Sequence, residues 1–230
     1  MNSFFQNSLF FGAFISLTSY GIGSLLKKKF KSVLFNPLLI AIVLTAATLL
    51  AFRIDYNNYY ESAKYIGYLL TPATICLAVP LYEQFELLKK NIAAVIVGIG
   101  TGAVTALCSV LALSYLFRLD HRSYVTLLPK SITTAIGIGV SEELGGYVSL
   151  TVAVIIITGV LGNIFAEIIC KLFRITEPIA KGIAIGTSSH AMGTSKAMEI
   201  GEIEGAMSSL SIVVSGILTV IGASIFANFM

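Results

Sequence analysis

Residues 183–198 read IAIGTSSHAMGTSKAM, and this stretch decides how the rest of the chain is interpreted. It lies between apolar, membrane-length segments, yet it is too polar and too rich in glycine to be an ordinary spanning helix. Hydroxyl residues at 187–189 run into His190, and a second small polar cluster follows at 193–195. Irregular polar backbone at membrane depth is tolerated only where protein or a water-filled cavity surrounds it. We therefore predict that the other segments are built to hold this one.

The composition indicates an integral membrane protein. Hydrophobic residues make up 56% of the chain and charged residues 12%, whereas a soluble domain has about 25% charged residues. Residues 33–52, 92–113 and 205–229 contain no charge at all, and a helical span needs about 20 apolar residues. These runs lack the alternation of barrel strands. The predicted fold class is an all-α polytopic membrane protein with about seven or eight segments.

The remaining composition predicts no cofactor, metal or nucleic-acid partner. The net charge of +3 is spread over loops, and the 3 cysteines lie far apart in apolar surroundings, which is typical of small buried hydrophobic residues. An enzyme is not predicted either, because no nucleophile is paired with a base. A triad could be assembled from Ser188, His190 and Glu199, but it lacks the nucleophile elbow that such triads use.

Basic residues predict the orientation of the chain. Residues 8–26 are interpreted as a retained first span, since no positive start or small-residue cleavage site precedes them. Lysines 27–29 and 31 follow at once, and Lys89 and Lys90 lie in a later loop. Cytoplasmic loops carry an excess of lysine and arginine, so these loops are expected inside and the N-terminus outside.

Two further segments are predicted to be interrupted. Residues 65–82 contain Pro72 and Pro80, and a proline inside a helix removes a donor and clashes with the preceding turn; a kinked but purely structural span is the alternative. In residues 127–146 the apolar part is only about eleven residues, too short to span. With Pro129 in its first turn, this segment is predicted to be a re-entrant half-helix.

The order of segments predicts two repeats within a single transmembrane domain, residues 1–230. Residues 33–117 and 147–229 each read as a span, a broken segment and a glycine-bearing span. Phe-Arg pairs recur at 52–53, 117–118 and 173–174. If residues 127–146 dip in without crossing, the repeats have opposite orientations. Inverted repeats around broken helices are typical of secondary transporters.

The breaks predict a site for a small carboxylate. A broken helix exposes orphan amides with about half a positive charge at one new end, and such an end binds small anions. His190 is a candidate for proton coupling because it titrates in the physiological range, although a satisfied structural histidine is the alternative. Lys130 and Lys196 are candidate anion partners or else interfacial lysines. The predicted substrate-binding residues are Thr71, Pro72, Ala73, Thr74, Lys130, Ser131, Thr133, Thr134, Gly186, Thr187, Ser188, Ser189, His190, Gly193, Thr194 and Ser195.

Three motifs in order resemble the LrgB/CidB family. They are LLTPATICLAVPLY at 69–82, LLPKSITTAIGIGVSEELGG at 127–146 and KGIAIGTSSHAMGTSKAMEIGEIEGAMSSLS at 181–211. The family commonly has proline where this chain has Ala135, which leaves the position of the break in the second motif open.

This resemblance implies a multi-pass protein of the bacterial cytoplasmic (inner) membrane. The family is described as holin-like or antiholin-like regulators of murein hydrolase activity, and it usually acts with a small LrgA/CidA-type membrane partner. Its plastid relatives are part of the glycolate/glycerate translocator. Two functions are therefore expected: a carrier of small 2-oxo or 2-hydroxy monocarboxylates (pyruvate, glycolate or lactate), proton-coupled and linked to autolysis, or a holin/antiholin-like regulator without specific transport. A homodimer is expected by analogy with carriers that pair through a scaffold span.

Overall fold

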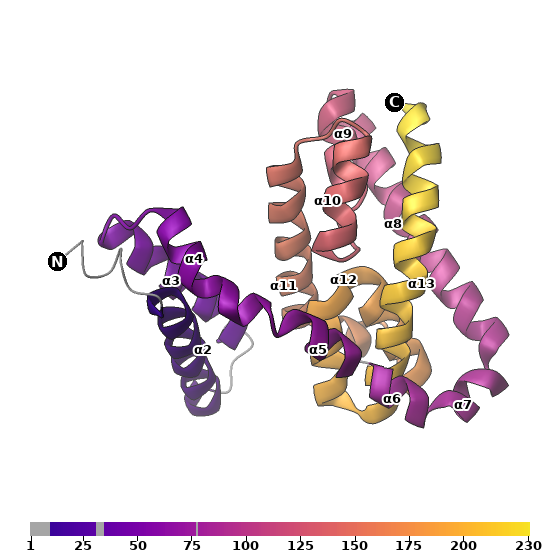
Figure 1. Ribbon diagram of the computed structural model, residues 1–230. Coiled ribbons are helices and arrows are strands. Elements are labelled where there is room, and N and C mark those ends of the chain that lie inside the picture. Colours follow the sequence, from indigo (N-terminus) through magenta and orange to yellow (C-terminus); the bar gives the residue numbers. More distant parts are fainter. Residues whose placement is uncertain (1–9, 31–34, 77) are drawn as a thin grey trace. The chain divides into compact units, whose positions relative to one another are not determined.

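All regular structure in the part of the chain described here is helical. The computed structural model describes residues 10–30, 35–76 and 78–230, and it is shown in Figure 1. The chain forms two compact units, one ending at Cys76 and one beginning at Leu77. The predicted all-α fold class is confirmed at this level.

The first unit is built on the packing of α2 against its neighbours. Gly12 N donates to Ser62 Oγ at 2.7 Å, and Ser16 Oγ and Tyr59 OH are 2.8 Å apart. Asn36 begins α3 by accepting hydrogen bonds from the amides of its first turn, as a helix cap does. The helices of this unit are α2 (Phe11–Phe30), α3 (Pro37–Ala51), α4 (Tyr56–Gly67) and α5 (Leu70–Cys76).

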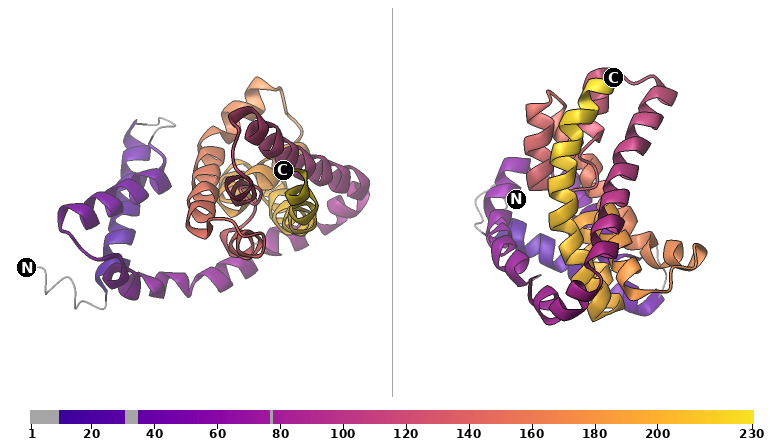
Figure 2. Two further views of the ribbon diagram at one scale, coloured as in Figure 1. Left: turned by 90° about the horizontal axis from the view of Figure 1, so that it is seen from above. Right: turned by 90° about the vertical axis from the view of Figure 1, so that its right-hand side faces the viewer.

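The second unit contains the long apolar helices. Within it, α13 packs against both α8 and α12, most extensively against α12; Figure 2 shows α13 (yellow) beside α12 (orange). Its elements are α6 (Ala78–Glu83), α7 (Phe85–Lys90), α8 (Ile92–Phe117), α9 (His121–Leu127), α10 (Thr134–Glu143), α11 (Val148–Leu172), α12 (Pro178–Ile200), α13 (Glu202–Phe226) and the 3-10 turn η1 (Ala227–Phe229).

Among the described residues, α8, α11 and α13 are the helices long and apolar enough to cross a membrane. α8 and α13 correspond to the uncharged runs at 92–113 and 205–229, and α11 corresponds to the span that opens the predicted repeat 147–229. The expected span at 33–52 is instead the 15-residue α3, about 22 Å long at 1.5 Å per residue, because Asn36 is extended and caps a helix that begins only at Pro37. The start of that span at 33–34, and residues 8–9 of the first span, lie outside the described residues.

Residues 65–82 do not form one helix, as predicted. The end of α4, α5 and α6 cover this segment, and α4 and α5 are separated by a turn at Tyr68. Pro72 and Pro80 are each the third residue of a short helix, where a missing amide costs no helical hydrogen bond. The prolines therefore stand near helix starts rather than inside broken spans.

The beginning of the segment predicted to be re-entrant, residues 127–146, differs from the prediction. Pro129 was expected in the first turn of a helix, and this was wrong. It lies in a turn between α9 and α10, in which Lys130 N donates to Leu127 O and Ile132 N donates to Pro129 O. The helix that follows, α10, has 10 residues, about 15 Å, and is too short to cross a bilayer, as expected.

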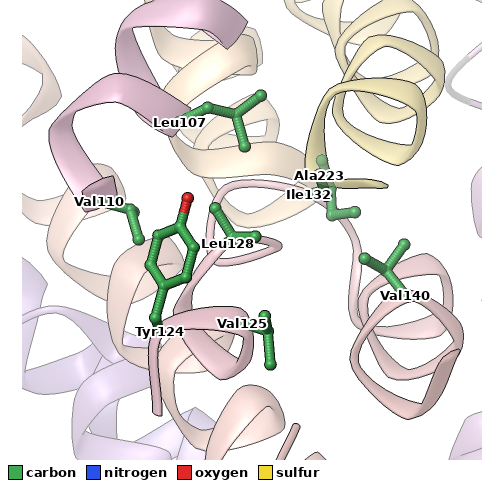
Figure 3. Close-up of a cluster of buried hydrophobic side chains, with 8 residues drawn as sticks. All are labelled: Leu107, Val110, Tyr124, Val125, Leu128, Ile132, Val140 and Ala223. Carbon is green, nitrogen blue, oxygen red and sulfur yellow. The ribbon is translucent and has the colours of Figure 1, made fainter. Parts of the chain in front are cut away.

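A buried apolar cluster holds this turn in place. Tyr124 lies between α8 and the turn, and its hydroxyl donates to Phe226 O at 2.9 Å. The cluster joins α8, α9, α10 and α13 and thus fixes where residues 128–133 sit. Figure 3 shows its members: Leu107, Val110, Tyr124, Val125, Leu128, Ile132, Val140 and Ala223.

The recurring Phe-Arg pairs are helix caps. Arg53, Arg118 and Arg174 have φ of 49°, 53° and 54°, the left-handed conformation that often ends a helix. At each end the next amide donates five residues back and the arginine amide donates three back; for α8 these are Leu119 N to Ser114 O at 3.0 Å and Arg118 N to Tyr115 O at 3.2 Å. This is the Schellman pattern. The three similar stretches therefore share one local way of ending a helix.

Replacing Arg118 by glycine should stabilise the fold. A left-handed residue with a Cβ costs about 1–2 kcal/mol, and glycine avoids this cost, partly offset by its greater freedom in the unfolded chain. We expect Arg118→Gly to raise the unfolding temperature in detergent, and Arg118→Ala, which removes the side chain but keeps the Cβ, not to raise it. An equal gain in both variants would assign the effect to the arginine side chain.

Candidate functional site

The central feature of the site is a break in α12 at His190. This residue has φ 43° and ψ −142°, which are not helical values, and the helix resumes directly after it. The segment singled out in the sequence is therefore not one regular helix, as predicted. His190 itself is 3% exposed, so the break lies inside the packed second unit.

One face of α11 holds the break. His190 Nε2 lies 3.0 Å from Ile155 O, and a Cβ added at Gly159 would lie 2.7 Å from His190 Cε1. A Cβ at Gly162 would lie only 1.7 Å from Ser189 Oγ. The backbone of α11 can come this close only because these positions are glycines.

The same face continues along the second half of α12 with polar contacts. Asn163 Nδ2 donates to Met192 O at 2.7 Å and to Ser195 Oγ at 3.2 Å. Lys196 Nζ lies 2.6 Å from Glu167 Oε1. Successive turns of α11 thus bind the residues that follow the break.

The first half of α12 packs on other partners. A Cβ at Gly186 would lie 2.4 Å from Ser208 O of α13, and a Cβ at Gly102 of α8 would lie 2.7 Å from Thr187 Cγ2. Thr194, beyond the break, also contacts α13, since its Oγ1 lies 2.7 Å from Ser208 Oγ. The break therefore separates a half held by α8 and α13 from a half held by α11 and α13.

A side chain at position 162 should push α11 away from the break. Overpacking of this kind typically costs about 1–3 kcal/mol, so Gly162→Ala should lower the unfolding temperature. Because the closest atoms are Ser189 Oγ and Cβ at 1.7 and 2.3 Å, the double variant Gly162→Ala with Ser189→Gly should recover part of the loss. Gly100→Ala on α8 is the matched control, since nothing lies within 4 Å of that position; equal destabilisation by both alanines would contradict this account.

A cavity of about 770 Å³ lies between α8, the first half of α12 and the turn before α10. Its walls are mainly small residues, which leave the space open. Polar groups face it from all three elements. They are Asn91, Thr101, Thr105 and Ser109 from α8 and the residue before it, Lys130 and Ser131 from the turn, and Glu177, Thr187 and Ser188 from α12 and its N-cap.

Lys130 is the cation of this cavity. It is half-buried, and its Nζ contacts Ser131 Oγ at 2.9 Å. Within residues 10–30, 35–76 and 78–230, the ion pairs found do not include Lys130. A partly buried ammonium without a counter-ion favours an anionic ligand, because the ligand compensates the loss of hydration.

Hydroxyl groups extend from Lys130 along the cavity. Thr101, Thr105 and Ser109 are four residues apart and so share one face of α8. Thr187 is 5% exposed, and its buried Oγ1 has no hydrogen-bond partner in the described part of the chain. The sequence interpretation assigned α8 to packing through Gly98 and Gly102 and missed these hydroxyls. Their spacing, Thr-x3-Thr-x3-Ser, was the signal available.

The structure brings together only some of the predicted residues. Lys130 and Ser131 share the cavity with Thr187 and Ser188, so two of the three interrupted segments meet. The other predicted residues of these two segments are not among those that line the cavity: Thr133, Thr134, Gly186, Ser189, His190, Gly193, Thr194 and Ser195.

The residues of the remaining segment belong to the first unit. Pro72 and Ala73 are exposed in α5, and the side chains of Thr71 and Thr74 lie outside the described part. Their participation in the site stays a prediction.

Long apolar helices and a broken helix beside a polar cavity together indicate a helical membrane protein with several candidate spans. Comparison with protein families matches residues 16–229 to the LrgB-like family, and the chain belongs to this family. Its relatives include the antiholin-like protein LrgB of Bacillus cereus (strain B4264) and that of Bacillus anthracis (strain CDC 684 / NRRL 3495). Each is 36% identical over 222 residues, which cover 96% of this chain and 96% of the relative. No solved structure matches the chain.

Proposed function

We propose that this protein is a secondary carrier of small 2-oxo and 2-hydroxy monocarboxylates, of the pyruvate, glycolate or lactate type, in the bacterial cytoplasmic membrane. The observation that supports this most is the cavity in which Lys130 lacks a carboxylate partner among the described residues. One cation compensates one carboxylate. Among the residues that line the cavity Lys130 is the one cation, and Glu177 also lines it, so a second carboxylate on the cargo would remain unpaired and would share the cavity with a like charge.

The hydroxyl groups in the cavity can bind the 2-oxo or 2-hydroxy group of the cargo. A 2-oxo group accepts hydrogen bonds, and a 2-hydroxy group both donates and accepts them. Threonine and serine hydroxyls can serve either group because each can donate and accept. Thr105 and Thr187 provide such groups in the cavity that Lys130 and Ser131 also line, whereas Thr101 Oγ1 donates to Gly98 O at 3.0 Å and is left as an acceptor. Because these hydroxyls can bind a 2-oxo or 2-hydroxy group, we expect the carrier to prefer acids that have such a group over acids that lack it.

The transport cycle would use the broken helix. His190 separates two halves of α12 that have different partners, and helices of this kind flank the substrate site in secondary transporters. We propose that residues 33–117 and 147–229 form the two inverted repeats and that one moves against the other. An LrgA/CidA-type partner and a homodimer belong to the same proposal.

Flux into proteoliposomes tests the carrier proposal. The purified protein should show saturable uptake of labelled pyruvate, glycolate or lactate and not of succinate. Lys130→Gln should reduce kcat/KM by roughly ten- to a hundredfold, since a charge-assisted hydrogen bond contributes about 1.5–3 kcal/mol. Lys90→Gln, an exposed lysine of α7 that does not line the cavity, should leave the flux unchanged.

The second candidate function is an antiholin-like regulator without specific transport, and the name of the relatives, antiholin-like protein LrgB, favours it. The same pair of variants separates the two functions. A regulator that acts through assembly needs no central cation, so Lys130→Gln would leave autolysis as in wild-type cells. If carboxylate flux is what alters autolysis, Lys130→Gln should change both readouts together. Absence of saturable uptake with a normal autolysis response would leave only the regulator.

Proton coupling through His190 predicts a pH-dependent flux. If His190 must carry a proton in the cycle, uptake should fall by roughly tenfold or more between pH 5 and pH 8, since the protonated fraction of an ordinary histidine falls about thirtyfold over this interval. The chain has 2 histidines, so His121→Asn is the matched control and should keep the wild-type profile. Uptake that is constant over this interval would remove the coupling role and leave His190 as the residue that fixes the break against Ile155 O.

A further inference from the structure

A second cavity, of about 670 Å³, lies where α11 ends and α12 begins. The Schellman turn at Arg174 forms one side of it: Ile175 N donates to Cys170 O at 2.8 Å, and Arg174 N donates to Lys171 O at 3.2 Å. With 25 residues, α11 is about 38 Å long, enough to cross the hydrocarbon core. Its end, and the cavity with it, therefore lies near a surface of the bilayer.

The rim of this cavity is cationic. Lys171 and Arg174 line it and are exposed, and the ion pairs found in the described residues include neither of them. Lys181 also lines it and pairs with Glu204 at 3.7 Å. Two positive charges therefore remain available at this point of the surface.

The two carboxylates that line the cavity form ion pairs with a lysine of α12. Glu167 and Glu199 line it, and both contact Lys196, at 2.6 and 3.2 Å. Lys196 contacts both groups, so its single positive charge offsets one of their two negative charges, and it joins α11 to α12. The carboxylates thus reduce the positive field at the rim without cancelling it.

The inner wall is apolar. Cys170 is 6% exposed, and Ile175 and Ile200 are half-buried beside it. A site with a cationic rim and an apolar wall at membrane-surface depth suits an amphiphilic anion better than a hydrated inorganic ion. Basic pockets between transmembrane helices are a recurrent binding place for the head groups of anionic lipids.

We propose that this cavity binds the head group of an anionic phospholipid, with the phosphate between Lys171 and Arg174 and the glycerol backbone against Ile175 and Ile200. The lipid would bridge the end of α11 and the start of α12. The proposal does not depend on the carrier function, since none of these residues lines the cavity that contains Lys130.

Native mass spectrometry of the full chain in neutral detergent tests this site. Phosphatidylglycerol should bind more tightly than phosphatidylcholine with the same acyl chains, and inorganic phosphate should not compete. The double variant Lys171→Gln with Arg174→Gln should weaken phosphatidylglycerol binding by roughly tenfold or more, as expected for the loss of two charges near a lipid phosphate. The charge-preserving variant Lys171→Arg with Arg174→Lys should keep most of the affinity and shows that the fold tolerates changes here.

The matched control is Lys89→Gln with Lys90→Gln, which removes two cations from the end of α7 outside this cavity. It should bind phosphatidylglycerol as the wild type does. Equal weakening in both double-glutamine variants would overturn the site in favour of diffuse attraction to basic residues. Unchanged binding in the Lys171/Arg174 variant, equal binding of phosphatidylcholine, or full competition by inorganic phosphate would each overturn it as well.

Discussion

The structure depends on the close approach of α11 to the break in α12. In lipid, backbone groups must be satisfied within the protein, so a non-helical residue such as His190 needs neighbours that reach its backbone and side chain. Gly159 and Gly162 allow α11 to come near, Ile155 O meets the imidazole, and Thr194 Oγ1 donates to the carbonyl of His190 at 3.0 Å. The break is thus stabilised by packing and by hydrogen bonds together.

This constraint divides the second unit into two regions with different chemistry. On one side, the first half of α12 and α8 enclose a cavity with hydroxyls and Lys130. On the other, the second half of α12 is bound to α11 by Asn163 and Glu167, near a cavity with a basic rim. Residues of α12 line both cavities: the half before the break contributes to each of them, and the half after it contributes Glu199 and Ile200 to the second.

Predictions from the sequence were correct for features that depend on neighbouring residues alone, such as the apolar length of a helix. The uncharged runs at 92–113 and 205–229 became α8 and α13, because burial in lipid requires apolar length and little else, whereas the run at 33–52 contains the shorter α3. The recurrent Phe-Arg pairs were interpreted through repeats, but they share a Schellman cap with arginine in the left-handed conformation. A common cap explains the similarity without a repeat, so the inverted-repeat proposal rests on the order of spans and breaks. The prediction that Pro129 begins a helix was wrong because the short helix α9 ends just before it, and the sequence of α9 has no strong periodic pattern from which that helix could be predicted.

By itself, the sequence determined that this is a helical membrane protein, that residues 183–198 are interrupted, and that Lys130 and the hydroxyls around it are candidates for an anion site. Only the tertiary structure decided which of these residues meet. The polar face of α8 and the turn at Lys130 and Ser131 share a cavity with Thr187, while His190 and Ser189 turn to α11. The physical reason is that the direction of a side chain after a break depends on non-local packing. Here glycines of another helix set that direction, and these contacts leave no periodic signal in the broken segment itself.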